Sequence, residues 1–370
     1  MIRVGILGCG GIARAHAGGY REFAARCRVV AVADIFAEKA REFAAGIGPE
    51  VAACTPEQLI ARPDVDLLSV CTPPFEHAPL TVAGLEAGKH VLVEKPMAVS
   101  LQECDAMLAA ARRSGRTLGV VHQNRFRPEF TRLKALVEAG ALGPLDLLAV
   151  NCLWWRGPEY YKLWWRGTWE KEGGGALLNH AVHFVDLLIW LGGMPEEVSA
   201  LVATRAHPIE VEDLAVALLR LPGGAVGQFT GTVDAHLNED RVEVCGRRAA
   251  VAVPWKVRAH SDRGDGFGVD DAAARSAVER AAAEVPVSPY RGHAAQIEPL
   301  LSALEQGGAP PVGGEDGRRA VEVITAMYAS AAGGGAQVLP LPPGHPCYTT
   351  DGLHAAMRAL LGQPARAEGR

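Results

Sequence analysis

The sequence lacks the features that mark several classes of protein. No stretch reaches the roughly 18 uninterrupted apolar residues of a membrane-spanning helix, and the first residues do not follow the basic-then-apolar order of a signal peptide. The eight cysteines are widely spaced, without a C-x-x-C pair, so neither a zinc site nor a disulfide framework is indicated. We therefore expect a cytoplasmic chain with no metal site and no membrane contact.

A surplus of positive charge is also absent. Lys and Arg number 37 against 42 Asp and Glu, which gives a formal net charge of -5, and the basic residues are scattered. A nucleic-acid partner is not expected, because binding a phosphate backbone requires clustered positive charge. What the chain does have is length. Its 370 residues, 49% of them hydrophobic, exceed one ordinary core and predict two domains.

The first third of the chain alternates short apolar runs with helical patterns. The runs cover residues 2–7, 29–33, 65–71, 91–93 and 117–121. Runs of this length, rich in β-branched residues and leucine and separated by helices, are typical of a parallel sheet covered on both faces. We predict a doubly wound α/β domain, a Rossmann fold, over residues 1–123.

The pattern then changes to successive strands joined by tight turns. Strands are predicted over residues 145–155, 198–204, 214–221, 225–233, 241–246 and 249–257. Residues 293–305 and 315–332 have amphipathic helical patterns, whereas the polar stretch 259–286 predicts nothing definite. We expect an α+β domain with a mainly antiparallel open sheet over 124–345. A C-terminal helix and tail follow over 346–370, fraying after Gly362.

A glycine-rich turn follows the first predicted strand directly. Gly8, Gly10 and Ala13 form a G-x-G-x-x-A motif that opens a helical pattern, the context in which this motif binds a dinucleotide pyrophosphate. Asp34, at the end of the second strand, can accept hydrogen bonds from the adenosine ribose and would repel a 2′-phosphate. NAD is therefore favoured, with NADP left possible. The predicted cofactor contacts here are Gly8, Gly10, Gly11, Ile12 and Asp34.

Two further motifs end strands at the same edge of the predicted sheet. Thr72-Pro73-Pro74 closes one strand and Glu94-Lys95-Pro96 closes another, at the edge where open α/β sheets bind ligands. The ammonium of Lys95 could hydrogen-bond a substrate hydroxyl and stabilise a developing alkoxide. Taken alone, a rigid turn and a salt-bridged lysine explain the two motifs equally well.

Three glycines at 173–175 lead into a predicted helix with a polar stripe. Asn179, His183 and Asp186 fall at i, i+4 and i+7, so they share one face of an α-helix. A stripe of this kind predicts a helix that borders a cleft. A solvated stripe, or a core histidine bonded to a carbonyl, is the plainer alternative.

Together these motifs resemble the glucose-fructose oxidoreductase and inositol dehydrogenase family (Gfo/Idh/MocA). The similar segments are 8–13, 72–77, 88–96, 173–186, 293–304 and 320–330. The resemblance implies that Lys95 and His183 are the catalytic pair. It also extends the predicted cofactor contacts to Thr72, Pro73, His77, Glu94 and Lys95. Asn179 stands where many members carry Asp; an amide can hold a hydroxyl but cannot accept its proton, so His183 becomes the predicted general base.

Residues 154–169 contain five of the seven tryptophans. Aromatic faces stack on the C–H faces of sugars, while Arg and Tyr bind hydroxyls, carboxylates or phosphates. An oligomer interface is an equally good explanation, because interfaces are also rich in Trp, Tyr and Arg. The predicted substrate contacts are Arg125, Arg156, Tyr160, Tyr161, Arg166, Asn179 and His180.

The motifs and the resemblance predict a dehydrogenase or reductase. It would move a hydride between NAD or NADP and a secondary carbinol carbon of a sugar, an inositol or a sugar derivative, as a homodimer or homotetramer. A small-molecule sugar or polyol is the expected partner. Two alternatives stay open: an NAD-dependent glycosidase of the same fold, and a sensor that binds the cofactor without catalysis.

Overall fold

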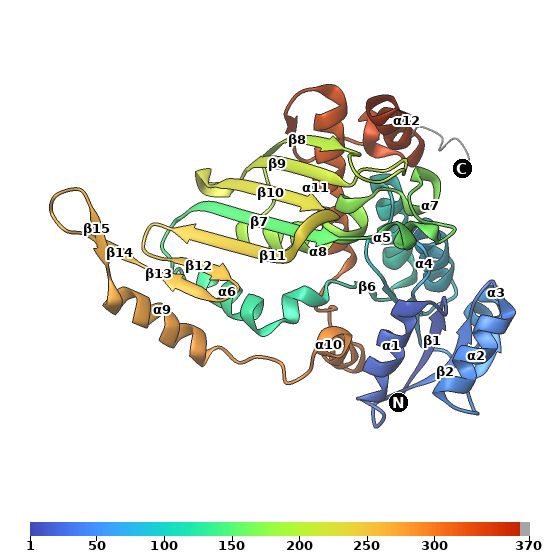
Figure 1. Cartoon of the computed structure of the whole chain (residues 1–370). Coiled ribbons are helices and arrows are strands. Elements are labelled where there is room, and N and C mark those ends of the chain that lie inside the picture. Colours follow the sequence, from blue (N-terminus) through green and yellow to red (C-terminus); the bar gives the residue numbers. More distant parts are fainter. Residues whose placement is uncertain (363–370) are drawn as a thin grey trace. The chain divides into compact units, whose positions relative to one another are not determined.

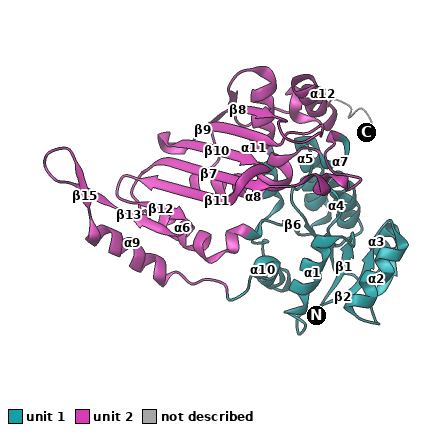
Figure 2. Cartoon of the chain, viewed as in Figure 1, with its two compact units in different colours: residues 1–123, 170–172, 289–321 teal, residues 124–169, 173–288, 322–370 magenta. Residues whose placement is uncertain are grey.

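The computed structural model describes residues 1–362, which form two compact units (Figure 2). Unit 1 comprises Met1–Gln123, Glu170–Glu172 and Pro289–Val321, and unit 2 comprises Asn124–Trp169, Gly173–Ser288 and the described part of Glu322–Arg370. The tail that the sequence predicted to fray, residues 363–370, lies outside the described residues.

A parallel sheet of six strands forms the centre of unit 1, in the order β3-β2-β1-β4-β5-β6. Its strands are β1 (Ile2–Leu7), β2 (Cys27–Ala33), β3 (Ala52–Cys54), β4 (Leu67–Val70), β5 (His90–Val93) and β6 (Leu118–Val120). Every residue of β4 is buried, as expected for a strand covered on both faces. The strand order reverses between β1 and β4, and their carboxyl ends therefore meet where dinucleotides bind in this fold. The predicted Rossmann domain is confirmed.

Helices cover this sheet, and one of them comes from far along the chain. The helices within unit 1 are α1 (Gly11–Arg21), α2 (Ala37–Ile47), α3 (Pro56–Ala61), α4 (His77–Glu86), α5 (Leu101–Ser114) and α10 (Gly292–Gln306). Ile297 and Leu300 of α10 share one buried cluster with Val4 and Ile6 of β1. This packing explains why residues 289–321 belong to unit 1, whereas the sequence analysis assigned them to the second domain.

Unit 2 is built on an eight-stranded sheet in the order β13-β12-β11-β7-β10-β9-β8-β16. The strands are β7 (Leu145–Trp155), β8 (Glu197–Ala203), β9 (Leu214–Arg220), β10 (Val226–Thr232), β11 (Asp234–Gly246), β12 (Ala250–Val253), β13 (Lys256–Arg258) and β16 (Gln337–Val338). Only β10 and β7 pair in parallel, and the other neighbours in this sheet are antiparallel. The prediction of a mainly antiparallel sheet is confirmed.

The remaining elements belong wholly or partly to unit 2. They are the helices α6 (Pro128–Glu138), α7 (Trp169–Glu172), α8 (Val182–Gly192), α9 (Ala272–Glu284), α11 (Gly314–Gly333) and α12 (Thr350–Leu361), and the strands β14 (His260–Asp262) and β15 (Gly268–Asp270). α7 and α11 each cross a unit boundary. The β14–β15 hairpin projects beyond the eight-stranded sheet (Figure 1), and together with α9 it occupies the stretch that the sequence left undefined.

The segment Trp169–Gly192 is long and apolar enough, by length and composition, to cross a membrane. Of its most apolar window, 94% is buried inside the structure. Such burial is the behaviour of a core helix, and this segment carries the predicted catalytic residues Asn179 and His183.

Candidate functional site

The glycine-rich turn between β1 and α1 leaves open space in front of the first residues of α1. Gly8 has φ +91°, and a Cβ at this position would lie 2.7 Å from the carbonyl oxygen of Cys71, so only glycine fits. Gly10 caps α1 without a side-chain hydrogen bond, and a Cβ on Gly10 or Gly11 would meet nothing within 4 Å. The first N–H groups of α1 therefore face an open cradle, which fits the pyrophosphate of a dinucleotide.

Asp34 lies beside this turn, directly after β2. Its carboxylate accepts the backbone N–H of Cys9 at 2.8 Å and that of Phe36 at 2.9 Å. These bonds fix the carboxylate and leave lone pairs for the hydroxyls of a ribose. Arg41, a candidate for reaching a 2′-phosphate, forms an ion pair with Glu38 instead.

Thr72 follows β4 at the same sheet edge. Its hydroxyl oxygen is buried and has no hydrogen-bond partner among residues 1–362, so it suits a bound polar group. His77, which was also predicted to contact the cofactor, is buried, and its ring nitrogens lie 2.9 Å from Thr72 O and 2.7 Å from Pro96 O. Burial lowers the pKa of this imidazole, although the hydrogen bonds to the two carbonyl oxygens act to raise it. The ring of His77 thus holds the protein's own backbone.

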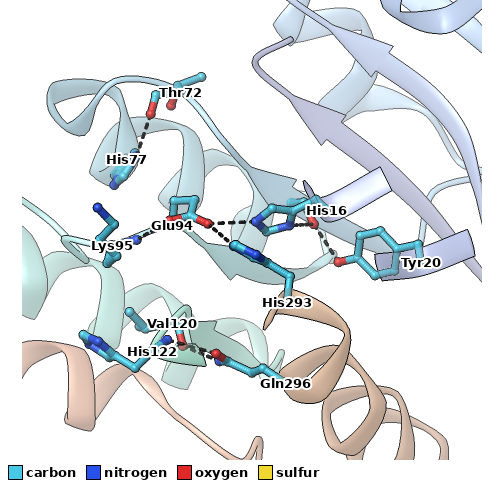
Figure 3. A network of polar contacts seen from close by, with 11 residues as sticks. His16, Tyr20, Thr72, His77, Glu94, Lys95, Val120, His122, His293 and Gln296 are labelled. Carbon is cyan, nitrogen blue, oxygen red and sulfur yellow. Dashed lines mark hydrogen bonds and ion pairs between the residues drawn. The ribbon is translucent and has the colours of Figure 1, made fainter. Parts of the chain in front are cut away.

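Glu94 is likewise engaged with the protein (Figure 3). Its Oε1 lies 3.0 Å from His16 Nε2 and 2.9 Å from His293 Nε2, and its Oε2 accepts the backbone N–H of Lys95 at 3.1 Å. Burial raises the pKa of Glu94, but the two imidazoles outweigh burial and hold the pKa well below its usual value. Although we predicted a cofactor contact at Glu94, its carboxylate serves these internal partners.

The cluster of His16, Glu94 and His293 is one that the sequence did not reveal. Their possible ligand atoms lie within 4.8 Å of one another, and no other group of His, Cys, Asp or Glu in the described chain converges in this way. No local motif links residues 16, 94 and 293, so only the fold brings them together.

The glycines at 173–175 lead first into a π-helical turn, Ala176–Ala181, and then into α8. The wider turn changes the spacing that the sequence analysis assumed for an α-helix. Asn179, His180, His183 and Asp186 are all buried, which excludes the solvated stripe. Single π-helical turns are rare and frequently mark functional sites.

Glu212 holds the start of this π-helical turn and was also missed by the sequence analysis. Its buried carboxylate accepts the N–H of Gly175 at 2.9 Å, the N–H of Leu177 at 2.9 Å and the hydroxyl of Tyr328 at 2.8 Å. Its backbone oxygen accepts the N–H of Ala176 at 2.9 Å. Burial raises the pKa of this carboxyl to about 7, although the hydrogen bonds that it accepts act to lower the pKa.

Arg125 was predicted to contact substrate, but it forms an ion pair inside unit 2. Its Nε lies 2.8 Å and its Nη2 lies 2.6 Å from the carboxylate of Asp186, and both side chains are buried. The same guanidinium lies over the ring of Trp190 at 5.5 Å. Arg125 therefore ties the segment before α6 to α8.

Five other predicted substrate contacts form one aromatic cluster. The guanidinium of Arg166 lies 3.8 Å from the ring centre of Tyr160, and that of Arg156 lies 5.5 Å from the same ring. Tyr161 and His180 contact Tyr160 at centroid distances of 5.2 and 5.3 Å. The cluster offers aromatic faces and two cations next to the π-helical turn.

A six-stranded sheet with a glycine cradle at its switch point, followed by a unit with a mainly antiparallel sheet, defines a two-domain oxidoreductase of the NAD-binding Rossmann class. The family model described as "Oxidoreductase family, NAD-binding Rossmann fold" matches residues 2–122, and that of the "GFO/IDH/MocA C-terminal domain" matches residues 130–252. The chain belongs to the Gfo/Idh/MocA family of oxidoreductases, as the sequence motifs predicted.

Relatives with curated names fall in the same family. The uncharacterized oxidoreductase YrbE of Bacillus subtilis is 30% identical over 257 residues, which cover 68% of this chain and 73% of YrbE. The myo-inositol 2-dehydrogenase of Thermotoga maritima is 29% identical over 258 residues, which cover 68% of this chain and 74% of that dehydrogenase. Among solved structures, the WlbA dehydrogenase from Bordetella pertussis in complex with NADH and UDP-GlcNAcA has a TM-score of 0.79 and 30% identity, covering 92% of this chain and 99% of its own.

Proposed function

We propose that this chain is an NAD-dependent dehydrogenase or reductase that acts on a secondary carbinol of a sugar, an inositol or a sugar derivative. The observation that carries the proposal is the position of Lys95, at the carboxyl end of β5 in an NAD-binding sheet. Its own N–H is held by the buried carboxylate of Glu94, and the carbonyl group of Pro96 is held by the buried His77. The named relatives support the substrate class, because they include a myo-inositol 2-dehydrogenase. The preference for NAD over NADP rests on the carboxylate of Asp34.

The residues of unit 1 fit the cofactor in the following way. The N–H groups of Gly10, Gly11 and Ile12 hold the pyrophosphate, Asp34 accepts hydrogen bonds from the adenosine ribose, and the hydroxyl of Thr72 binds a further polar group. When bound, the cofactor supplies the carbon that accepts or donates the hydride.

Lys95 and His183 share the handling of the substrate proton in this proposal. The ammonium of Lys95 donates a hydrogen bond to the reacting oxygen and stabilises the negative charge that develops there. His183, on α8, takes the hydroxyl proton, because a neutral imidazole is a common general base near neutral pH. The amide of Asn179 orients the hydroxyl but cannot accept its proton.

The aromatic cluster of unit 2 supplies the proposed sugar contacts. Tyr160 and Tyr161 offer ring faces, while the guanidinium groups of Arg156 and Arg166 offer planar hydrogen-bond donors. His180 adds a polar ring on the π-helical turn itself. A polyol presents both apolar C–H faces and hydroxyls, which this combination can bind together.

We also propose that the chain acts in the cytoplasm as a homodimer or homotetramer. Leu201 of β8 and Leu218 of β9 are 77% and 59% exposed on neighbouring strands, with Val216 and Val226 also exposed. Contiguous exposed apolar side chains on a sheet face are typical of an interface between subunits.

The test of the proposal is a substrate screen with the purified protein. NAD is added with inositols and sugars, and reduction is followed by the absorbance of NADH; chromogenic glycosides form a parallel arm. We expect Lys95→Ala to lower kcat/KM by about 10²- to 10⁴-fold while NADH still binds, because the variant loses the group at the reacting oxygen. Lys39→Ala, an exposed lysine on α2, is the matched control.

Three results would contradict the proposal. Unchanged turnover in Lys95→Ala would remove Lys95 from the mechanism. Release of the chromophore without net formation of NADH would identify a glycosidase. Cofactor binding without turnover of any tested polyol or glycoside would indicate a sensor.

A further inference from the structure

Three histidines, His16, His77 and His293, hold groups on both sides of Lys95 along the chain, and Figure 3 shows all three. On one side, His16 of α1 and His293 of α10 contact the carboxylate of Glu94, which in turn accepts the N–H of Lys95. On the other side, His77 of α4 contacts the carbonyl oxygen of Pro96 at 2.7 Å. Three separate helices thus hold the backbone around one lysine: α1 and α10 act on the peptide before Lys95, and α4 acts on the carbonyl group of the next residue, Pro96.

The protons of the network can be assigned from its chemistry. A carboxylate only accepts, so His16 and His293 both carry a proton on Nε2 and donate it to Glu94. In a neutral His16 ring, Nδ1 is then an acceptor, and it lies 3.3 Å from the hydroxyl of Ser69. Tyr20 donates its own hydroxyl to Ser69 at 2.6 Å. Burial lowers the pKa of His16, which agrees with the neutral ring.

The charge of Glu94 explains why three donors are needed. A buried carboxylate without hydrogen bonds is strongly destabilised, so its direction is fixed by the donors that surround it. His16 and His293 direct Oε1, and this leaves Oε2 facing the N–H of the next residue. Removal of either imidazole frees the carboxylate to rotate and to release that N–H.

We propose that His16 and His293 are positioning residues for Lys95, acting through Glu94 to fix the peptide from which the lysine side chain extends. The inference rests on the proposed function in one respect: Lys95 is the group that meets the substrate. The same three side chains could ligate a divalent cation, but the hydrogen bonds already satisfy the facing atoms without one.

The experiment compares two substitutions at His293. His293→Leu removes the Nε2 donor, while His293→Gln keeps an N–H donor at similar reach. The first readout is the NMR resonance of the Lys95 amide proton, and the second is kcat/KM for the best polyol. We expect His293→Leu to shift that resonance upfield and to lower kcat/KM by up to about 100-fold, the effect of a small misplacement of a catalytic group. His293→Gln should restore most of both.

Glu298→Gln is the matched control on the same helix. Glu298 pairs with Arg26 at 3.0 Å, so the substitution weakens the attachment of α10 without touching Glu94. We expect the Lys95 resonance and the turnover to stay as in the original protein. If Glu298→Gln reproduced the effects of His293→Leu, the role would be general attachment and the proposal would be wrong.

Further outcomes keep the test decisive. A folded His293→Leu variant with unchanged Lys95 resonance would overturn the proposal even if no polyol were turned over, so its failure is separable from that of the proposed function. If His293→Leu does not fold, Ser69→Ala removes the hydroxyl that contacts both His16 Nδ1 and Tyr20 and should shift the resonance partially; no shift would count against the proposal. Stoichiometric binding of Zn²⁺ alone, abolished by His293→Gln, would replace it with a metal site.

Discussion

At the scale of single residues, Asp34 shows how a charge can be fixed before any ligand arrives. Its two oxygens are each held by a backbone N–H, from Cys9 and from Phe36, so the carboxylate cannot turn away from the glycine cradle. A phosphate placed beside it would face a like charge at short range. The neighbouring cation, Arg41, is engaged with Glu38 and does not offset this charge.

We expect Asp34→Asn to shift the cofactor preference toward NADP. The amide keeps an acceptor oxygen but loses the negative charge, so the ratio of kcat/KM for NADP to that for NAD should rise by about tenfold or more. Steady-state kinetics with both cofactors measure this ratio. Glu42→Gln removes another exposed carboxylate of α2, without releasing Arg41 from Glu38, and should leave the ratio unchanged. An unaltered ratio in Asp34→Asn would show that Asp34 does not select the cofactor.

Some site residues could be read from the sequence because they adjoin a strand end. Gly8 directly follows β1 and Lys95 is the second residue after β5, where the chain order alone predicts the ligand edge. His293 contacts Glu94 across 199 positions, and no local pattern reveals such a partner. For the same reason the sequence could not show that Arg125 pairs with Asp186.

At the scale of elements, the start of the π-helical turn depends on a side chain from another segment. Helix N-termini carry N–H groups without intrahelical partners, and here Glu212 accepts those of Gly175 and Leu177. Its pKa of about 7 lies above the ordinary value of 4.5, so the folded chain binds this proton more tightly than the unfolded chain does. The free energy of unfolding should therefore fall as the pH rises from about 4.5 to 7.

Glu212→Gln tests this pH dependence. Over the range from about pH 5 to pH 8, the original protein should lose about 3 kcal/mol through this group, whereas the variant, which cannot ionise, should lose correspondingly less. Urea unfolding at several pH values measures the difference. Tyr328→Phe removes one donor but keeps the carboxyl, so it should retain the slope. Equal slopes in the original protein and in Glu212→Gln would refute the assignment.

Gly175→Ala probes the same junction from the other side. A Cβ on Gly175 would lie 1.9 Å from the carbonyl oxygen of Glu212, so the backbone must move. We expect a loss of at least about 2 kcal/mol of stability, together with reduced turnover. Gly18→Ala, in α1 where a Cβ meets nothing within 4 Å, should instead stabilise by about 0.5 to 1 kcal/mol. Thermal unfolding of both variants measures these changes. A stable Gly175→Ala variant or a destabilised Gly18→Ala variant would contradict the expectation.

The elements themselves were mostly predictable, and the misses have physical causes. The strand β3 is short and consists of small residues at a sheet edge, so it gives little apolar signal. The sequence predicts α-helix where the structure has a π-helical turn, because a single wider turn has no signature in apolar spacing. The hairpin β14–β15 is exposed throughout and lacks the alternation that marks a half-buried strand.

At the scale of the whole molecule, the exposed face of the eight-stranded sheet bears on assembly. We expect Leu218→Asp combined with Leu201→Asp to lower the molar mass in solution, because two buried charges would oppose the apolar contact between copies. Light scattering after size exclusion measures the mass. Phe267→Asp is the control, since Phe267 is 68% exposed but lies in the turn between β14 and β15, outside the eight-stranded sheet. An unchanged mass in the double variant would place any interface elsewhere.

The helix α10 lies late in the sequence but packs in unit 1, and this affects how the protein folds during translation. Translation delivers β1 to β6 and the glycine cradle early, but Ile297, Leu300 and His293 emerge only after most of unit 2 has been synthesised. A nascent chain that stops short of residue 292 therefore exposes the apolar surface that α10 covers and leaves Glu94 without one of its donors. Domains usually mature in the order of synthesis, N-terminal first. In this chain the cofactor domain is completed late, so a ribosome that stalls midway releases a fragment with the cofactor motif but not the finished cofactor domain.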